Sequence, residues 1–299
     1  MSAHLYLKCT AAAMLLVMAG CGDPEPNDGS TVGADSLSVD TSATSSVLKV
    51  NGKLFSVPSP VQSALLIRKL ELPYDQGLAM PLEKAQMVAT RSGKALAMGI
   101  FGADLAYVTT YKDAQRAVST LQSIETLGRS LNVGNAFDQP LLKRFKDNLN
   151  NEDSLLVLGS AAYRAADQYL KNNASDDISV LVLTGGFIES LYLSTASPGA
   201  LKDQRIADRI GEQKTTLNNL VDLIKTIEGQ QDVGALLAGL KELQTLFDGI
   251  TLTYEYSEPV TDAAAKTTYI NSSRTVTITG EQVNAIATKV TALRNTILA

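Results

Sequence analysis

Apolar residues recur at helical spacing along most of the chain beyond residue 60. The clearest run is the last one, in which apolar residues step by three and four positions: Val283, Ile286, Val290, Leu293 and Ile297. Such steps place these residues on one face of a helix. Thr279 and Gln282 have the spacing of a capping box, in which each side chain bonds the backbone N–H of the other residue. The pattern predicts a final helix with one buried face.

A series of small residues lies between positions 95 and 107. Ala95, Gly99 and Ala103 follow one another at four-residue intervals, so on a helix they form a ridge along one side. A ridge of small side chains lets a second helix approach closely. We therefore predict a tight helix–helix contact at this segment.

A nearly continuous apolar stretch runs from residue 178 to residue 193, interrupted by Gly185, Gly186 and Glu189. A membrane-spanning helix needs about 20 predominantly apolar residues. The shorter stretch therefore predicts a buried core element.

Residues 180–187 also allow a second interpretation, a strand that enters a glycine-rich turn and then a helix. Such a turn can bind a phosphate at the helix N-terminus, and it would favour an α/β fold. No complete nucleotide-binding fingerprint accompanies it, and the further strands of such a sheet are missing.

Alternation of apolar and polar residues occurs at residues 251–256 and 275–279, which predicts two strands just before the final helix. Asn51-Gly52 between two short apolar runs predicts a β-hairpin near the start of the domain. The predicted fold class is mainly α: a multi-helix, bundle-like domain with a small C-terminal β-ribbon before the last helix.

The N-terminus resembles a bacterial lipoprotein signal peptide. Lys8 precedes a short apolar core, and the small residues Ala19 and Gly20 come directly before Cys21. The resemblance to a lipobox implies a lipid attached to the Cys21 sulfur. Two or more acyl chains hold a protein firmly on a membrane without a spanning helix.

Three segments follow from this interpretation. Residues 1–20 are the signal peptide, residues 21–46 an acidic tether and residues 47–299 the helical domain. The tether is polar and rich in Ser, Thr and Asp without any Lys or Arg, so disorder is expected. Gly22 follows the cysteine where Asp would resemble an inner-membrane retention signal, which favours the outer membrane. Whether the domain faces the periplasm or the outside stays open.

Removal of the signal peptide limits the available chemistry. His4 and Cys9 lie within it, so the mature chain has no histidine and, once Cys21 is lipidated, no free thiol. Serine and cysteine triads need a base such as histidine, and zinc sites need histidine or cysteine. We therefore predict no metal site and no cofactor. Loss of Lys8 also changes the formal charge from −5 to −6, which argues against nucleic acid as a partner.

Asp104 and Glu189 are the candidate functional residues, because each carboxylate stands in an apolar segment. A buried carboxylate must be hydrogen-bonded, or its pKa rises. One hypothesis pairs the two for acid–base chemistry or for a cation. The other has a tyrosine hydroxyl, Arg164 or a backbone group satisfy each of them separately.

Three stretches carry a family resemblance: residues 99–107, 182–192 and 266–271. There the chain resembles a family of uncharacterised, mostly helical lipoproteins of Gram-negative bacteria, over most of its length after the tether. The resemblance implies a largely helical envelope protein and brings no activity, ligand or catalytic residue with it.

The functional prediction is a lipid-anchored module of the cell envelope that is not an enzyme and binds a protein or a small ligand. The membrane itself is a partner through lipidated Cys21. Two alternatives are a carboxylate-dependent envelope enzyme, acting on glycans through Asp104 and Glu189, and a phosphate- or nucleotide-binding α/β protein that uses residues 180–186.

Overall fold

A computed structural model describes residues 45–133 and 176–297, apart from positions 51–52, 59, 230, 263 and 265, together with scattered positions between 134 and 175. The predicted signal peptide, Cys21 and nearly all of the predicted tether lie outside the described residues, and so does Arg164.

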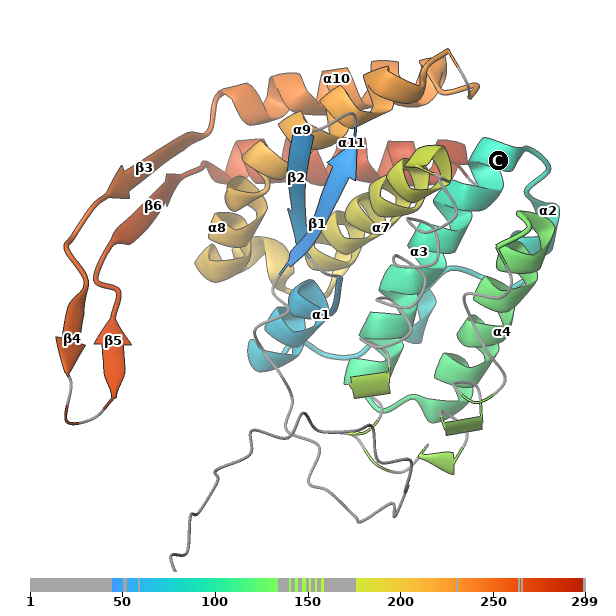
Figure 1. Cartoon of the computed structure of the whole chain (residues 1–299), viewed down its shortest axis with the longest axis horizontal. Helices are drawn as coiled ribbons and strands as arrows, with labels where there is room; N and C mark the ends of the chain where they lie inside the picture. The colour runs from blue at the N-terminus through green and yellow to red at the C-terminus, as the bar shows by residue number, and fades with distance from the viewer. Residues whose placement is uncertain are drawn as a thin grey trace, which may run out of the picture. The chain divides into compact units, whose positions relative to one another are not determined.

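The described part is mainly helical, with small antiparallel ribbons before the last helix, which confirms the predicted fold class (Figure 1). The helices are α1 Pro60–Lys69, α2 Lys84–Met87, α3 Arg91–Thr110, α4 Ala114–Ser130, α7 Asp176–Ala196, α8 Gln204–Glu212, α9 Lys214–Ile227, α10 Gly234–Asp248 and α11 Gly280–Ile297, with short 3₁₀ turns at Gln76–Leu78 and Ala200–Lys202. The strands are β1 Ser45–Val50, β2 Lys53–Pro58, β3 Thr251–Glu255, β4 Val260–Asp262, β5 Thr267–Tyr269 and β6 Ser273–Thr277.

Helix α7 is the centre of the core. It is long and apolar enough to cross a membrane, with a mean hydropathy of 1.4 over its most apolar 18 residues, but 83% of that window is buried inside the domain. Helices α3, α9 and α11 pack around it. The predicted core element is confirmed. The interpretation of residues 180–187 as a strand and phosphate-binding turn is wrong, because these residues lie within a continuous helix.

Helices α3 and α7 approach until their backbones touch. A Cβ atom on Gly99 of α3 would collide with the backbone oxygen of Val182, and one on Gly185 of α7 would collide with the backbone oxygen of Leu96. The ridge predicted around Gly99 is therefore a contact between helices. Glycine is required there because any side chain would force the two backbones apart.

Helix α11 forms as its sequence predicts. The backbone N–H of Thr279 donates to the Gln282 side chain at 2.8 Å, and the N–H of Gln282 donates to the Thr279 hydroxyl at 3.2 Å. This reciprocal cap confirms the capping box. Four of the five predicted apolar positions of α11 are buried, from Val283 to Leu293, and Ile297 is partly buried against the core.

The ribbons are antiparallel. β3 pairs with β6, with Leu252 opposite Val276, and β4 pairs with β5. The Val276 side chain of β6 packs into the space that Gly211 of α8 leaves open. This end of the β3–β6 ribbon therefore contacts the helices. β1 also pairs with β2 as predicted, with Val50 opposite Lys53; the turn residues 51–52 lie outside the described part.

Candidate functional site

Two tyrosine hydroxyls of α3 form hydrogen bonds with the backbone of the segment between α1 and α2. Tyr111 of α3 donates to the backbone oxygen of Leu72 at 2.6 Å, and Tyr107 accepts from the backbone N–H of Asp75 at 3.0 Å. Burial raises the pKa of Tyr107 to about 12, so its hydroxyl stays protonated at neutral pH. These bonds position the backbone of residues 78–80 beside the core.

Asp104 of α3 accepts a hydrogen bond from the backbone of this segment. Its side chain is nearly inaccessible, at 1% exposure, and its Oδ2 accepts from the N–H of Met80 at 2.8 Å. Arg116 of α4 donates to the Met80 backbone oxygen and so holds the same peptide segment from the other side. The second oxygen of Asp104, Oδ1, has no donor among the described hydrogen-bonding groups.

Glu189 of α7 is fully buried and is paired with Arg294 of α11. The guanidinium donates to both carboxylate oxygens, at 2.6 Å from Nε and 2.9 Å from Nη2. Nη2 also donates to the backbone oxygen of Leu78 at 2.9 Å. The ring of Tyr192 lies under the guanidinium, with 4.0 Å between the ring centroid and Cζ, a cation–π contact that suits a cation removed from water.

The structure brings Asp104 and Glu189 together. Both lie beside residues 78–80, Asp104 through the N–H of Met80 and Glu189 through Arg294, which also bonds the Leu78 oxygen, and each carboxyl group shifts the pKa of the other. Burial raises the pKa of Asp104 well above its ordinary value, and the negative charge of Glu189 raises it further. Burial also raises the pKa of Glu189, but Arg294 opposes that rise. The surroundings therefore favour the neutral form of Asp104 more than that of Glu189, whose charge Arg294 stabilises.

This arrangement bears on both sequence hypotheses. The two residues lie near the same segment, which is compatible with the first one. Both side chains are buried, however, and one carboxyl oxygen of Asp104 accepts a hydrogen bond from a backbone N–H, as the second hypothesis predicted. Hydrolysis of glycosides needs carboxyl groups that flank a bound sugar. With exposures of 1% and 0%, these two present no face to a substrate in the part of the chain that is described.

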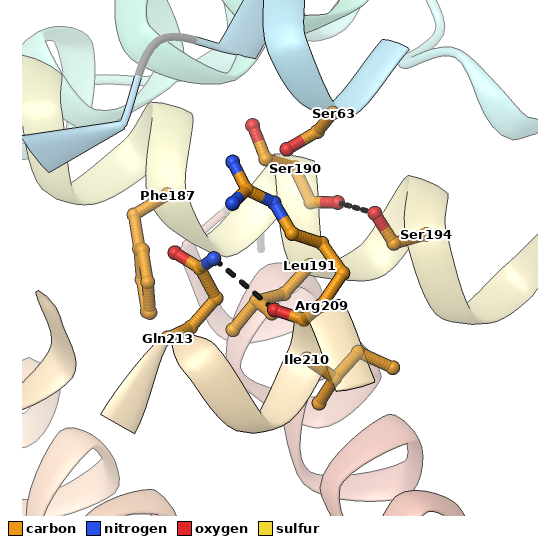
Figure 2. Close-up of a pocket in the computed structure, with 8 residues that line it drawn as sticks. All are labelled: Ser63, Phe187, Ser190, Leu191, Ser194, Arg209, Ile210 and Gln213. Carbon is orange, nitrogen blue, oxygen red and sulfur yellow. Dashed lines mark hydrogen bonds between the residues drawn. The ribbon is translucent and has the colours of Figure 1, made fainter. Parts of the chain in front are cut away.

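A small pocket lies nearby between α7 and α8 (Figure 2). Its lining residues are Ser63, Phe187, Ser190, Leu191, Ser194, Arg209, Ile210 and Gln213. The Arg209 guanidinium is already bonded to Glu212 at 3.0 Å and to Gln62 at 3.3 Å. The volume open to a water-sized molecule is about 20 Å³, which is room for about one water molecule. The pocket is too small for an organic ligand.

Large apolar side chains gather on the ribbons. Eight such side chains are exposed among the described residues, and five of them lie between positions 254 and 270: Tyr254, Tyr256, Val260, Tyr269 and Ile270. We call these five the ribbon patch. Tyr254 and Tyr256 stand two residues apart, and Val260 lies opposite Tyr269 across the β4–β5 pair. Tyrosine is enriched where proteins bind other proteins.

Metal ligands do not gather in the described regions, where no group of three or more histidine, cysteine, aspartate or glutamate residues is placed to hold an ion. Comparisons with protein-family models, with curated proteins and with solved structures found no match for the chain. The resemblance to helical lipoproteins therefore stays a prediction.

Sequence reasoning missed Arg294, which neutralises Glu189. One signal was present: Arg294 follows Leu293 directly and stands four residues after Val290, so it borders the apolar face of the last helix. An arginine at such an edge is normally solvated, and only the position of Glu189 shows that this one turns inward.

Proposed function

We propose that the chain is a lipid-anchored binding protein of the cell envelope that is not an enzyme, and that the ribbon patch contacts a partner protein. The concentration of exposed apolar side chains on residues 254–270 carries this proposal. Elsewhere in the described part such side chains occur singly, at Leu65, Met87 and Leu201, which is normal for a protein surface.

An extended strand of a partner protein is the occupant that the ribbon suits best. Each described ribbon has two strands only, so both of its edges offer unpaired backbone donors and acceptors. An added strand satisfies those groups, and side chains such as Tyr254 and Tyr256 then supply apolar contact and specificity. Glu255, Glu258 and Asp262 interleave with the patch and outnumber the basic residues of the same stretch, Lys266 and Arg274, so the net charge disfavours an anionic membrane surface.

The two alternatives lack such support. The acid pair that a carboxylate-dependent enzyme would use is sealed in the core. The phosphate-binding turn that an α/β protein would use is the middle of helix α7.

The anchor has a direct test. In the bacterial host, Cys21→Ala should abolish incorporation of labelled fatty acid and move the protein from the membrane to the soluble fraction, because the sulfur that carries the lipid is gone. Cys9→Ala is the matched control and should leave both unchanged, since Cys9 lies in the predicted signal peptide. Retention of Cys21→Ala in the membrane fraction would refute lipid anchoring through this residue.

The ribbon patch is tested with a photo-crosslinking amino acid placed at Tyr256, which is 73% exposed, and at Met87, which is 64% exposed and lies off the ribbon. We expect a discrete protein adduct in the native envelope from position 256 and none from position 87. The crosslinked protein, once purified, should bind the wild-type chain at least about tenfold more tightly than Tyr254→Ser/Tyr256→Ser, because buried tyrosines dominate binding energy.

Three results would contradict the partner proposal. The first is equal affinity of the wild-type and double-serine proteins for the purified partner. The second is an adduct with a second copy of this chain, together with a dimer in analytical ultracentrifugation. The third is binding of the lipid-free protein to anionic vesicles that the serine substitutions abolish.

A further inference from the structure

The two ribbons before the last helix form one continuous arm. β3 leads into β4 on one side and β5 leads into β6 on the other, so the two sides of the arm are residues 251–262 and 267–277 (Figure 1). Between the two strand pairs, the backbone N–H of Ser257 donates to the Ser272 hydroxyl at 3.0 Å, and that hydroxyl donates to the Ser257 backbone oxygen at 3.1 Å. The arm therefore stays closed along its length, and each side has one outer backbone edge.

The 251–262 side is poorly suited to an added strand. Pro259 comes directly before β4 and has no N–H to donate. Glu255, Glu258 and Asp262 lie along the same side, which contains no lysine or arginine. Charged residues and proline are two means by which proteins protect a strand edge from further pairing.

The 267–277 side has a different composition. Residues 267–273 contain no charged residue, no proline and no glycine. Ile270, at 77% exposure, is the most exposed large apolar residue of the described part, and Tyr269 beside it is also exposed. An exposed, uncharged segment with β-branched and aromatic residues pairs readily with another strand. This side is therefore the edge at which a strand is added.

Two cations delimit that edge. Lys266 comes directly before the uncharged segment and Arg274 directly after it. Both side chains are exposed, and neither takes part in the ion pairs of the described residues. Their charges are thus available to a partner.

We propose that the partner protein adds its strand to the 267–277 side and that this strand is acidic at both ends. The inference rests on the proposed function and specifies the edge and the chemistry of the partner. Paired strands align residue for residue. A segment of about nine residues, with a carboxylate near each end and uncharged residues between them, therefore meets Lys266 and Arg274 together.

A second copy of the chain suits this edge less well. The acidic side of its arm is residues 251–262, where the break between β3 and β4 and the missing N–H of Pro259 interrupt the backbone donors. That side cannot supply a continuous strand, although its charge has the right sign.

Selection from a library of displayed nine-residue peptides tests the chemistry of the partner. The bait is the full chain purified in detergent, and we expect it to enrich peptides with Asp or Glu near both ends. Such peptides should bind Lys266→Glu/Arg274→Glu at least about tenfold more weakly, because attraction at each end becomes repulsion. Both substitutions are at exposed positions, where the fold tolerates a change of side chain.

Glu255→Lys/Glu258→Lys is the matched control on the other side of the arm. It should bind the same peptides within about twofold of the wild-type affinity at physiological ionic strength, where salt screens charges that are not in contact.

Residue-resolved amide hydrogen exchange with an enriched peptide locates the added strand. Amides of residues 267–277 that exchange fast in the free chain are those without a partner across the ribbon, and they should gain at least about tenfold protection. The fast-exchanging amides of residues 251–262 should remain fast.

Four results would overturn the inference: no enriched peptide, enriched peptides that bind Lys266→Glu/Arg274→Glu as well as the wild type, new protection on residues 251–262 instead, or slow exchange along residues 267–277 without peptide, which would mean that the chain itself occupies the edge. If one of these occurs while position 256 still gives its protein adduct, the edge is wrong and the proposed function stands. Absence of that adduct refutes the proposed function itself.

Discussion

Replacing Gly99 by alanine will destabilise the protein by at least about 3 kcal/mol, at the upper end of what overpacking costs in a protein core. The added methyl group has no space, because the backbone oxygen of Val182 already occupies it and the backbone N–H of Gly186 lies next to it. A flexible side chain could turn aside, but backbone atoms within a helix cannot. Helices α3 and α7 must therefore separate, and every contact along their crossing weakens.

Gly102→Ala is the matched control for this prediction. Gly102 lies on the same helix, three residues further on, and a Cβ atom there meets no described atom within 4 Å. Alanine is favoured over glycine in a helix by up to about 1 kcal/mol, so this variant should be as stable as the wild type or slightly more stable. Urea unfolding followed by circular dichroism measures both. Equal midpoints for Gly99→Ala and Gly102→Ala would show that the crossing is looser than described.

The elements that sequence predicts best are those defined by local rules. The capping box at Thr279 and the stepped apolar positions of α11 both depend on residues within one or two turns of each other, and both are present as predicted. Alternation at residues 251–256 likewise predicted the ribbon, because period-two patterns describe strands irrespective of their neighbours.

Residues 180–187 show where a local rule is ambiguous. Apolar residues followed by two glycines are compatible with a strand and turn or with a helix that another helix approaches closely. What decides between them is a contact 89 positions away, where Gly185 meets Leu96 of α3. The small-residue ridge around Gly99 is the complementary half of that contact, and considered together the two segments favour helix.

The sequence identified the two acids of the candidate site but not the arginine that pairs with one of them. Asp104 and Glu189 stand out because each is an acid in an apolar segment, and that pattern correctly identified both as buried. Their partner could not be found in the same way. Arg294 is 105 positions from Glu189 and 216 from Leu78, and helical periodicity indicates which face of a helix is buried but not which helix it meets.

Arg294 itself provides the second large effect. Arg294→Met should destabilise the protein by about 3–5 kcal/mol, because it leaves the Glu189 carboxylate buried without a partner. The loss should also raise the pKa of Glu189 beyond its present value, since Arg294 is the group that now opposes the effect of burial. The measurement is urea unfolding at pH 7. Arg205→Met is the matched control; that arginine pairs with Asp203 at the surface, and its loss should leave the midpoint unchanged.

The double variant Glu189→Met/Arg294→Met separates the ion pair from its packing. Removal of both charges restores an apolar contact, and buried ion pairs replaced in this way often lose little stability. The double variant should therefore be more stable than Arg294→Met alone, which gives a favourable coupling energy between the two positions. Additive losses would mean that Arg294 acts through Tyr192 and the Leu78 oxygen and not through Glu189. In that case α11 would be held by the bond from Arg294 to the backbone oxygen of Leu78.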